Sequence, residues 1–275
     1  MAGSEEANTD DEHPVLPEDW RTRPPEAHEL PAGYCVIICD ASHKDTITGI
    51  SVTIRFNNEE CGPYECTARS KGPVHAELTA VQKALAKLKR IKRSRAVHTV
   101  VVFTDSKYAC NFLESVWNPK RHYIKGTISK IADTWNEING GNTQLIICHT
   151  RTKFIRRIDR RATRKRKEEQ ERKLLDIRKR VEHVEAAIVR GRDIHVDEVD
   201  DEFLAYPISG GSPPGYRVGL DPPYCECAWW RLRWANKGTV IINARALPCK
   251  HMCALAEHLS KDIYDVFEHQ INRVD

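Results

Sequence analysis

Residues 99–113 read TVVVFTDSKYACNFL, and the architecture of the N-terminal half of the chain follows from them. The apolar run, rich in Val and Phe, is typical of a strand that is buried on both faces of a sheet. It ends abruptly at Asp105. In sheets covered by helices, ligands bind where strands end, and a carboxylate there avoids full desolvation while it stays rigidly held. Asp105 is therefore a candidate site residue; the alternative is that it only caps the following helix.

The segments on either side of this stretch alternate between strand and helix patterns. Strands are predicted at 34–42, 47–56, 60–69, 99–104 and 143–149, and helices at 75–91, 106–115 and 127–138. The helix at 75–91 has apolar residues three or four positions apart, as expected for an amphipathic helix. The order predicts an α/β fold, in which a mixed five-stranded sheet carries helices on its faces.

Composition excludes several classes of protein. The chain has 275 residues, a net charge of +4, 40% hydrophobic and 30% charged residues, which is ordinary for a globular protein. No apolar stretch approaches the roughly 18 residues of a membrane span, so no membrane partner is expected. The acidic start MAGSEEANTDDEHP is unlike a signal peptide and predicts a cytoplasmic protein, or a nuclear one in a eukaryote. In such reducing compartments the ten cysteines should not form disulfides.

Changes in composition predict four regions along the chain. An acidic, proline-rich N-terminus (1–32) is expected to be disordered, and the α/β domain follows at 33–165. A charged helix and linker (166–202) then lead to a small C-terminal module (203–275), with the linker composition continuing to about 215. Apolar residues between 174 and 188 follow a short heptad pattern. This helix could pair with a second chain, but packing on its own domain, and hence a monomer, is favoured.

Three more acids are predicted to lie near Asp105. Asp40 ends the first strand, Glu77 lies in the first turn of the helix at 75–91, and Asp159 lies near the start of the long helix. If strands one and four are neighbours, these carboxylates converge and repel one another unless they hold hard divalent cations. Two such ions can activate water for attack on a phosphodiester. The alternatives are caps and surface charges, with the arginines around Asp159 pairing with it.

Four blocks in this order, VIICDAS, HAELTAVQKAL, VVFTDSKYA and CHTRTKFIRRID, resemble ribonuclease H of type 1. The resemblance implies a catalytic domain at 33–165 with the RNase H-like fold. It implies an endonuclease that hydrolyses the RNA strand of RNA–DNA hybrids by a two-metal mechanism and leaves 5′-phosphates. Two Mg²⁺ or Mn²⁺ ions would be held by Asp40, Glu77, Asp105 and Asp159. His149 would assist proton transfer or product release, a role suited to an imidazole.

The substrate-contacting positions depart from the family pattern. SHKDT replaces a glycine- and asparagine-rich turn after the first Asp, Pro73-Val74 replaces a polar pair, and Cys148 replaces a glycine. The residues that would recognise the RNA 2′-hydroxyl are therefore harder to identify from the sequence than the residues that would catalyse hydrolysis. The candidates for nucleic-acid contacts are Ser42, Lys44, Lys89, Arg90, Lys120, Arg121, Arg151 and Lys153. Two alternatives stay open: a catalytically weak or inactive nucleic-acid-binding scaffold, and a nuclease that acts on DNA.

The C-terminal module contains two short half-sites with zinc-binding residue types. Cys225 and Cys227 form CxC, and Cys249 and His251 form CxH, which together make a tetrahedral Cys₃His set for one structural Zn²⁺. The pattern resembles the SWIM zinc finger, which implies a DNA or protein partner. The alternative is a set of buried thiols. The WWRLRW segment (229–234) could stack on bases or pack the small core.

Overall fold

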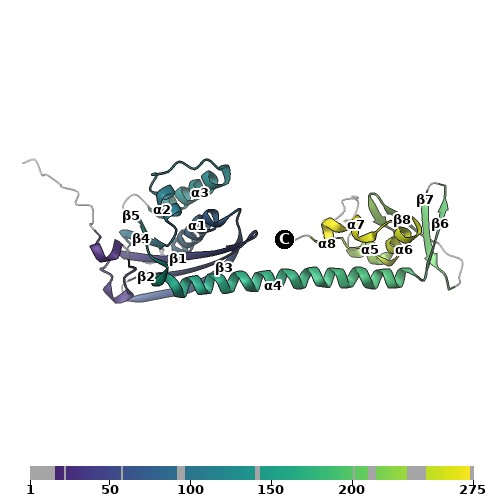
Figure 1. Ribbon diagram of the computed structural model, residues 1–275, viewed down its shortest axis with the longest axis horizontal. Coiled ribbons are helices and arrows are strands. Elements are labelled where there is room, and N and C mark those ends of the chain that lie inside the picture. The colour runs from purple at the N-terminus through teal and green to yellow at the C-terminus, as the bar shows by residue number, and fades with distance from the viewer. Residues whose placement is uncertain are drawn as a thin grey trace, which may run out of the picture. The chain divides into compact units, whose positions relative to one another are not determined.

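The computed structural model describes residues 16–21, 23–56, 58–91, 97–139, 143–200, 202–209, 215–233 and 246–272 (Figure 1). The chain divides into two compact units, Met1–Gln170 and Glu171–Asp275. The boundary lies within the longest helix. Over the described ranges, no helix is both long enough and apolar enough to cross a membrane.

The N-terminal unit is built on a five-stranded sheet with the order β3-β2-β1-β4-β5. Strand β1 is antiparallel to β2 and parallel to β4, and β5 is parallel to β4, so the sheet is mixed. The strands are β1 (Tyr34–Lys44), β2 (Ile47–Phe56), β3 (Glu59–Arg69), β4 (Thr99–Thr104) and β5 (Gln144–His149). The predicted α/β class and the mixed five-stranded sheet are confirmed.

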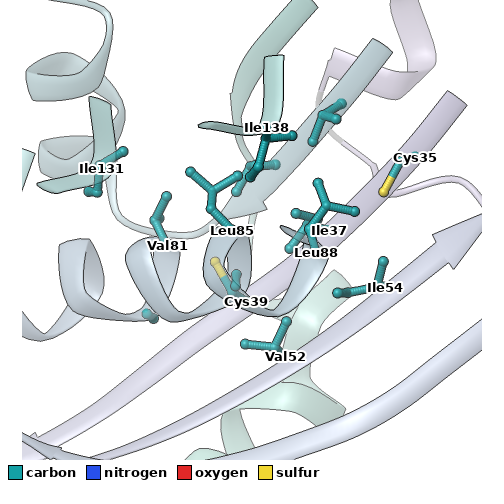
Figure 2. Packing of buried hydrophobic residues seen from close by; sticks show 14 of the residues in the cluster. Cys35, Ile37, Cys39, Val52, Ile54, Val81, Leu85, Leu88, Ile131 and Ile138 are labelled. Carbon is teal, nitrogen blue, oxygen red and sulfur yellow. The ribbon is translucent and has the colours of Figure 1, made fainter. Parts of the chain in front are cut away.

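Helices α1 (Pro73–Ile91), α2 (Lys107–Leu113) and α3 (His122–Asn139) contribute to the core on one face of the sheet. Because side chains alternate along a strand, Cys35, Ile37 and Cys39 of β1 all point to this face. Figure 2 shows Leu85 and Leu88 of α1 packing over these strand residues. Both leucines are fully buried, and they come from the amphipathic stripe that predicted the helix.

The opposite face of the sheet is covered by the first part of α4 (Thr152–Gly191). Ile155 and Ile158 of α4 pack with Ile38 of β1 and Phe103 of β4. The helix crosses β2 at Gly49, where a Cβ atom would overlap the backbone of Ala162. Gly49 therefore permits a close approach of helix and sheet that any larger residue would prevent.

Part of the N-terminal region contradicts the prediction of disorder. Two 3₁₀ turns, Glu18–Arg21 and Ala27–Glu29, bring Leu16, Trp20 and Leu30 into the α4-side core, where each is buried. These apolar residues are scattered among acids and prolines, so composition alone masked them. The rest of the predicted disordered region, residues 1–15 and 22, lies outside the described residues.

The C-terminal unit contains a second, four-stranded antiparallel sheet with the order β6-β7-β8-β9. Its strands are β6 (Ile194–Val199), β7 (Glu202–Pro207), β8 (Tyr216–Leu220) and β9 (Pro223–Cys225), and its helices are α5 (Ala228–Arg233), α6 (Lys250–His258), α7 (Ile263–Val266) and α8 (Glu268–Ile271). The prediction of a linker within 166–202 and on to 215 was wrong for β6 and β7. They form a hairpin whose acidic and proline residues resemble a linker, while Ile194, Val196 and Ala205 enter the core.

Candidate metal centres

The topology of the sheet brings the predicted acids to one edge. The parallel pairing of β1 with β4 ends at Ile38 and Phe103, just before Asp40 and Asp105. Beyond this point β1 continues alongside β2 alone, so the two carboxylates flank the place where β1 and β4 stop pairing. Glu77 approaches from the first turns of α1 on one face, and Asp159 from α4 on the other. Residues far apart in the sequence thus approach one edge of the sheet, although Asp159 is not among the carboxylates that lie within 4.8 Å of one another.

Three of the carboxylates are close enough to share a cation. One oxygen from each of Asp40, Glu77 and Asp105 lies within 4.8 Å of the others. Asp40 is only 3% exposed, and Oε2 of Glu77 is buried without a hydrogen-bond partner among the described residues. A buried polar atom without a partner is costly, and hard divalent ions bind such carboxylate oxygens. The donor set therefore fits Mg²⁺ or Mn²⁺.

The electrostatics of the cluster agree with this fit. Burial raises the pKa of Asp40 to about 8, with the negative charges of Asp105 and Asp159 adding to the effect. Burial also raises the pKa of Glu77 well above its usual range, and the charge of Asp40 is the next contribution. Both carboxyls thus resist ionisation on their own, and a bound divalent cation would reverse that preference.

Asp105 does not act as the helix cap that was the alternative interpretation. Ser106 caps α2 instead, since its Oγ accepts a hydrogen bond from the backbone N–H of Ala109 at 3.2 Å. His149, at the end of β5, is exposed, and its Nε2 donates to the backbone carbonyl of Asp105 at 3.1 Å. The structure therefore places the predicted histidine directly beside the acidic cluster.

The residues predicted to contact nucleic acid differ in whether their side chains are engaged within the protein. Ser42 is engaged with α4, because its Oγ accepts hydrogen bonds from Thr163 at 3.1 Å and Arg166 at 3.0 Å. Lys89 forms an ion pair with Glu137 of α3 at 2.8 Å. The remaining predicted contact residues have exposed side chains: Lys44, Arg90, Lys120, Arg121, Arg151 and Lys153.

Lys120 and Arg121 line a cavity that the sequence reasoning missed. Its volume is about 480 Å³, and it lies between the start of α1 and the segment that joins α2 to α3. Trp117 and Tyr123 also line it, so aromatic and basic groups face the same space. The segment WNPKRHY (117–123) interleaves these residue types, and this was the signal that could have identified the cavity.

In the C-terminal unit, the four predicted zinc ligands come together. The Sγ atoms of Cys225, Cys227 and Cys249 and a ring nitrogen of His251 lie within 4.8 Å of one another, and all four residues are buried. Nδ1 of His251 is 3.6 Å from the sulfur of Cys225 and 3.9 Å from that of Cys249. Tetrahedral bonds of about 2.3 Å to sulfur and about 2.0 Å to nitrogen place these atoms about 3.6 Å apart, so the set fits zinc.

Backbone groups support the sulfurs of this cluster. The N–H of Cys227 donates to the sulfur of Cys225, and that of Trp230 donates to the sulfur of Cys227. Hydrogen bonds of this kind orient thiolates that bind a metal. Cys253 lies outside the ligand set, and burial raises its pKa to about 12, which keeps it a thiol. Trp230 is buried in the small core and Trp229 is half-buried, while Trp234 lies outside the described residues.

The geometry therefore defines an α/β unit with a carboxylate cluster, followed by a unit with a Cys₃His cluster. Residues 216–260 match the family model of the SWIM zinc finger, which confirms the predicted resemblance for this part of the chain. A comparison with curated protein sequences gives no match.

Among solved structures, similarity is found to ribonucleases H1. LC11-RNase H1, isolated from compost by a metagenomic approach, is 21% identical, with 50% of this chain and 97% of that chain covered and a TM-score of 0.43. RNase H1 from the halophilic archaeon Halobacterium salinarum is 12% identical, with 48% and 98% covered and a TM-score of 0.41. LC11-RNase H1 in complex with an RNA/DNA hybrid is 20% identical, with 44% and 89% covered and a TM-score of 0.39.

Proposed function

We propose that the N-terminal unit is a metal-dependent endonuclease that hydrolyses the RNA strand of RNA–DNA hybrids and leaves 5′-phosphate ends. The observation that carries the proposal is the convergence of Asp40, Glu77 and Asp105 at the edge of the sheet. One buried oxygen of Glu77 has no hydrogen-bond partner in the part of the chain that the structure describes. A structural salt-bridge network would supply cations to such a cluster. Here burial and the neighbouring negative charges instead raise the pKa of Asp40 and of Glu77, which favours a divalent ion as the missing partner.

Each residue has a distinct role in this proposal. Asp40, Glu77 and Asp105 hold Mg²⁺ or Mn²⁺, and Asp159 completes the negative site from α4. The bound ions supply Lewis acidity and a water of lowered pKa. His149, beside Asp105, delivers a proton to the leaving oxygen or assists release of the product. Lys120 and Arg121, in the cavity near the start of α1, hold backbone phosphates of the hybrid.

The C-terminal unit binds one Zn²⁺ through Cys225, Cys227, Cys249 and His251 and needs it to fold. Much of its core surrounds the zinc ligands, and a module this small gains a large share of its stability from a structural metal. A DNA or protein partner for this unit is part of the same proposal.

Cleavage of labelled substrates tests the nuclease assignment. An RNA–DNA hybrid, duplex RNA and duplex DNA are compared with Mg²⁺ and with Mn²⁺, in wild type, Asp105→Asn and Asp133→Asn. Asp133 is an exposed acid on α3 outside the cluster and serves as the matched control. The hybrid alone should be cut, and Asp105→Asn should lower the rate on the order of a hundredfold or more, because metal charge supplies several kcal/mol of the catalysis.

Two outcomes would change the conclusion. Undiminished cleavage by Asp105→Asn would remove the carboxylate cluster from the chemistry. Wild-type protein that binds the hybrid but cleaves none of the substrates with either metal would support the scaffold alternative, which the engagement of Ser42 with α4 favours. Preferential cleavage of duplex DNA would support the remaining alternative.

A further inference from the structure

The C-terminal unit contains a cavity of its own beside the Cys₃His cluster. Its volume is about 480 Å³, within the range of small-ligand sites. Cys227, Cys249 and His251 form part of its wall, so a zinc ion bound by these residues would hold that wall in place. The other side chains that matter to its chemistry are His183, Arg190, Tyr216, Trp229 and Lys250.

Aromatic rings supply much of the lining. His183 stacks on Trp229, with ring centroids 5.1 Å apart and an interplanar angle of 14°. Nε2 of His183 donates to the carbonyl of Pro248 at 3.2 Å, which fixes the orientation of this ring pair. Tyr216 lies against His251 at 4.9 Å and is 39% exposed, so part of its ring is open to an incoming ligand. Flat aromatic surfaces of this kind bind nucleobases by stacking.

The charges around the cavity have one sign. Arg190 and Lys250 line it, and no aspartate or glutamate is found among its described lining residues. Arg190 is exposed near the end of α4, and Lys250 is the first residue of α6, where the helix dipole adds positive potential. The cavity therefore suits a ligand that combines a planar ring with a negative charge.

We propose that this cavity binds a nucleotide of single-stranded nucleic acid, with the base stacked on the rings and the phosphate on Arg190 and Lys250. A duplex keeps its bases inside the stack, whereas an unpaired base can enter a cavity of this size. An acidic peptide would form ion pairs with Arg190 and Lys250 but would offer no planar group to stack on the aromatic rings. The proposal rests on the nucleic-acid partner proposed above for the C-terminal unit. It concerns a site separate from the carboxylate cluster and does not depend on hybrid cleavage.

Binding of fluorescein-labelled dT₁₀ to the zinc-loaded protein of 275 residues tests the proposal by fluorescence anisotropy. Trp229→Ala should weaken binding about tenfold, and Trp229→Phe should weaken it less because a ring remains. Arg190→Gln should weaken binding and lower the slope of log affinity against log salt by about 0.7, the value for one contact to a single strand. Lys179→Gln, an exposed charge on the same helix outside the cavity, is the matched control.

The readouts separate this site from the nuclease site and from misfolding. Zinc content is measured for every variant, and Arg190→Gln, which changes an exposed residue, remains informative if Trp229→Ala loses zinc. Asp105→Asn should bind dT₁₀ as wild type does, even if the cleavage assay fails. Photo-cross-linking of 5-iodouracil-containing dT₁₀ should label Tyr216 or Trp229. Wild-type affinity in the folded Trp229→Ala and Arg190→Gln variants, or no binding of dT₁₀ at 50 mM salt, would overturn the proposal.

Discussion

Replacing Asp40 by asparagine should stabilise the N-terminal unit when no divalent cation is present. Asp40 is almost fully buried, and burial together with Asp105 and Asp159 raises its pKa to about 8. Asparagine has the same shape and keeps an oxygen to accept the hydrogen bond that the backbone of Ala41 gives to Asp40. The substitution therefore removes the charge with little change in packing.

The size of the effect follows from linkage between ionisation and folding. The ordinary pKa of an aspartate is 3.8, so between about pH 4 and pH 8 the folded protein holds a proton that the unfolded chain has released. Stability of the wild type must then fall as pH rises through this window. One pKa unit corresponds to about 1.4 kcal/mol, which gives a maximum cost of about 4 kcal/mol at pH 7. Since asparagine still buries an amide, we expect a gain of about 2 kcal/mol or more.

The assay is hydrogen exchange of the β1 and β4 amides in increasing urea, which reports on the N-terminal unit alone. Buffers are passed over chelating resin, because a soluble chelator would also remove zinc from the Cys₃His cluster. The wild type should lose stability between pH 5 and pH 8, and Asp40→Asn should not. Mg²⁺ at a hundred times its dissociation constant should stabilise the wild type by about 2.7 kcal/mol and the variant much less.

The reasoning would be refuted by a wild type whose stability rises with pH in this window without Mg²⁺. It would also be refuted if Asp40→Asn lowered stability by more than about 1 kcal/mol under the same conditions. Either result would mean that the carboxylates do not converge in a buried site. Asp133→Asn, on an exposed surface of α3, controls for the general effect of removing one negative charge.

Other predictions follow from packing and from the zinc cluster. The double variant Cys225→Ser, Cys249→Ser should lose its one zinc per chain by metal analysis, whereas Cys253→Ser should retain it, because Cys253 lies outside the ligand set. Gly49→Ala should lower the free energy of unfolding by about 2 kcal/mol or more in urea titrations, since the new methyl group meets the α4 backbone. Leu85→Ala should cost about 2–5 kcal/mol by the same measurement, since the side chain is fully buried.

The sequence predicted the N-terminal sheet well because two local signals agreed there. The apolar run of β1 is followed by Asp40 within the strand, and that of β4 by Asp105 just after it. Both signals have one cause, namely that the apolar runs stop where the pairing of β1 with β4 ends. The zinc ligands were predictable for a different reason. CxC and CxH each place two metal ligands two residues apart in the sequence. Only the approach of these two pairs to one another therefore depended on the fold.

The elements that the sequence missed owe their structure to distant partners. The β6–β7 hairpin carries a run of acids, and its few apolar residues become informative only once α6 covers them. Trp20 likewise lies in a proline-rich segment and is buried by the sheet rather than by neighbours in sequence. Contacts of this kind have no local periodicity, which is why composition suggested a linker and a disordered tail.

Asp159 shows how a pattern already in the sequence could have decided between two interpretations. The arginines next to it left open whether it pairs with them or faces the other acids. The buried residues of this stretch are Ile155, Ile158 and Ala162, spaced as one stripe of a helix, and Asp159 lies on that stripe. Arg156, Arg157 and Arg160 are exposed, and among the described residues no arginine forms an ion pair with Asp159. Because Asp159 lies on the stripe that packs α4 on the sheet, its carboxylate is near Asp40. The negative charge of Asp159 contributes to the raised pKa of Asp40.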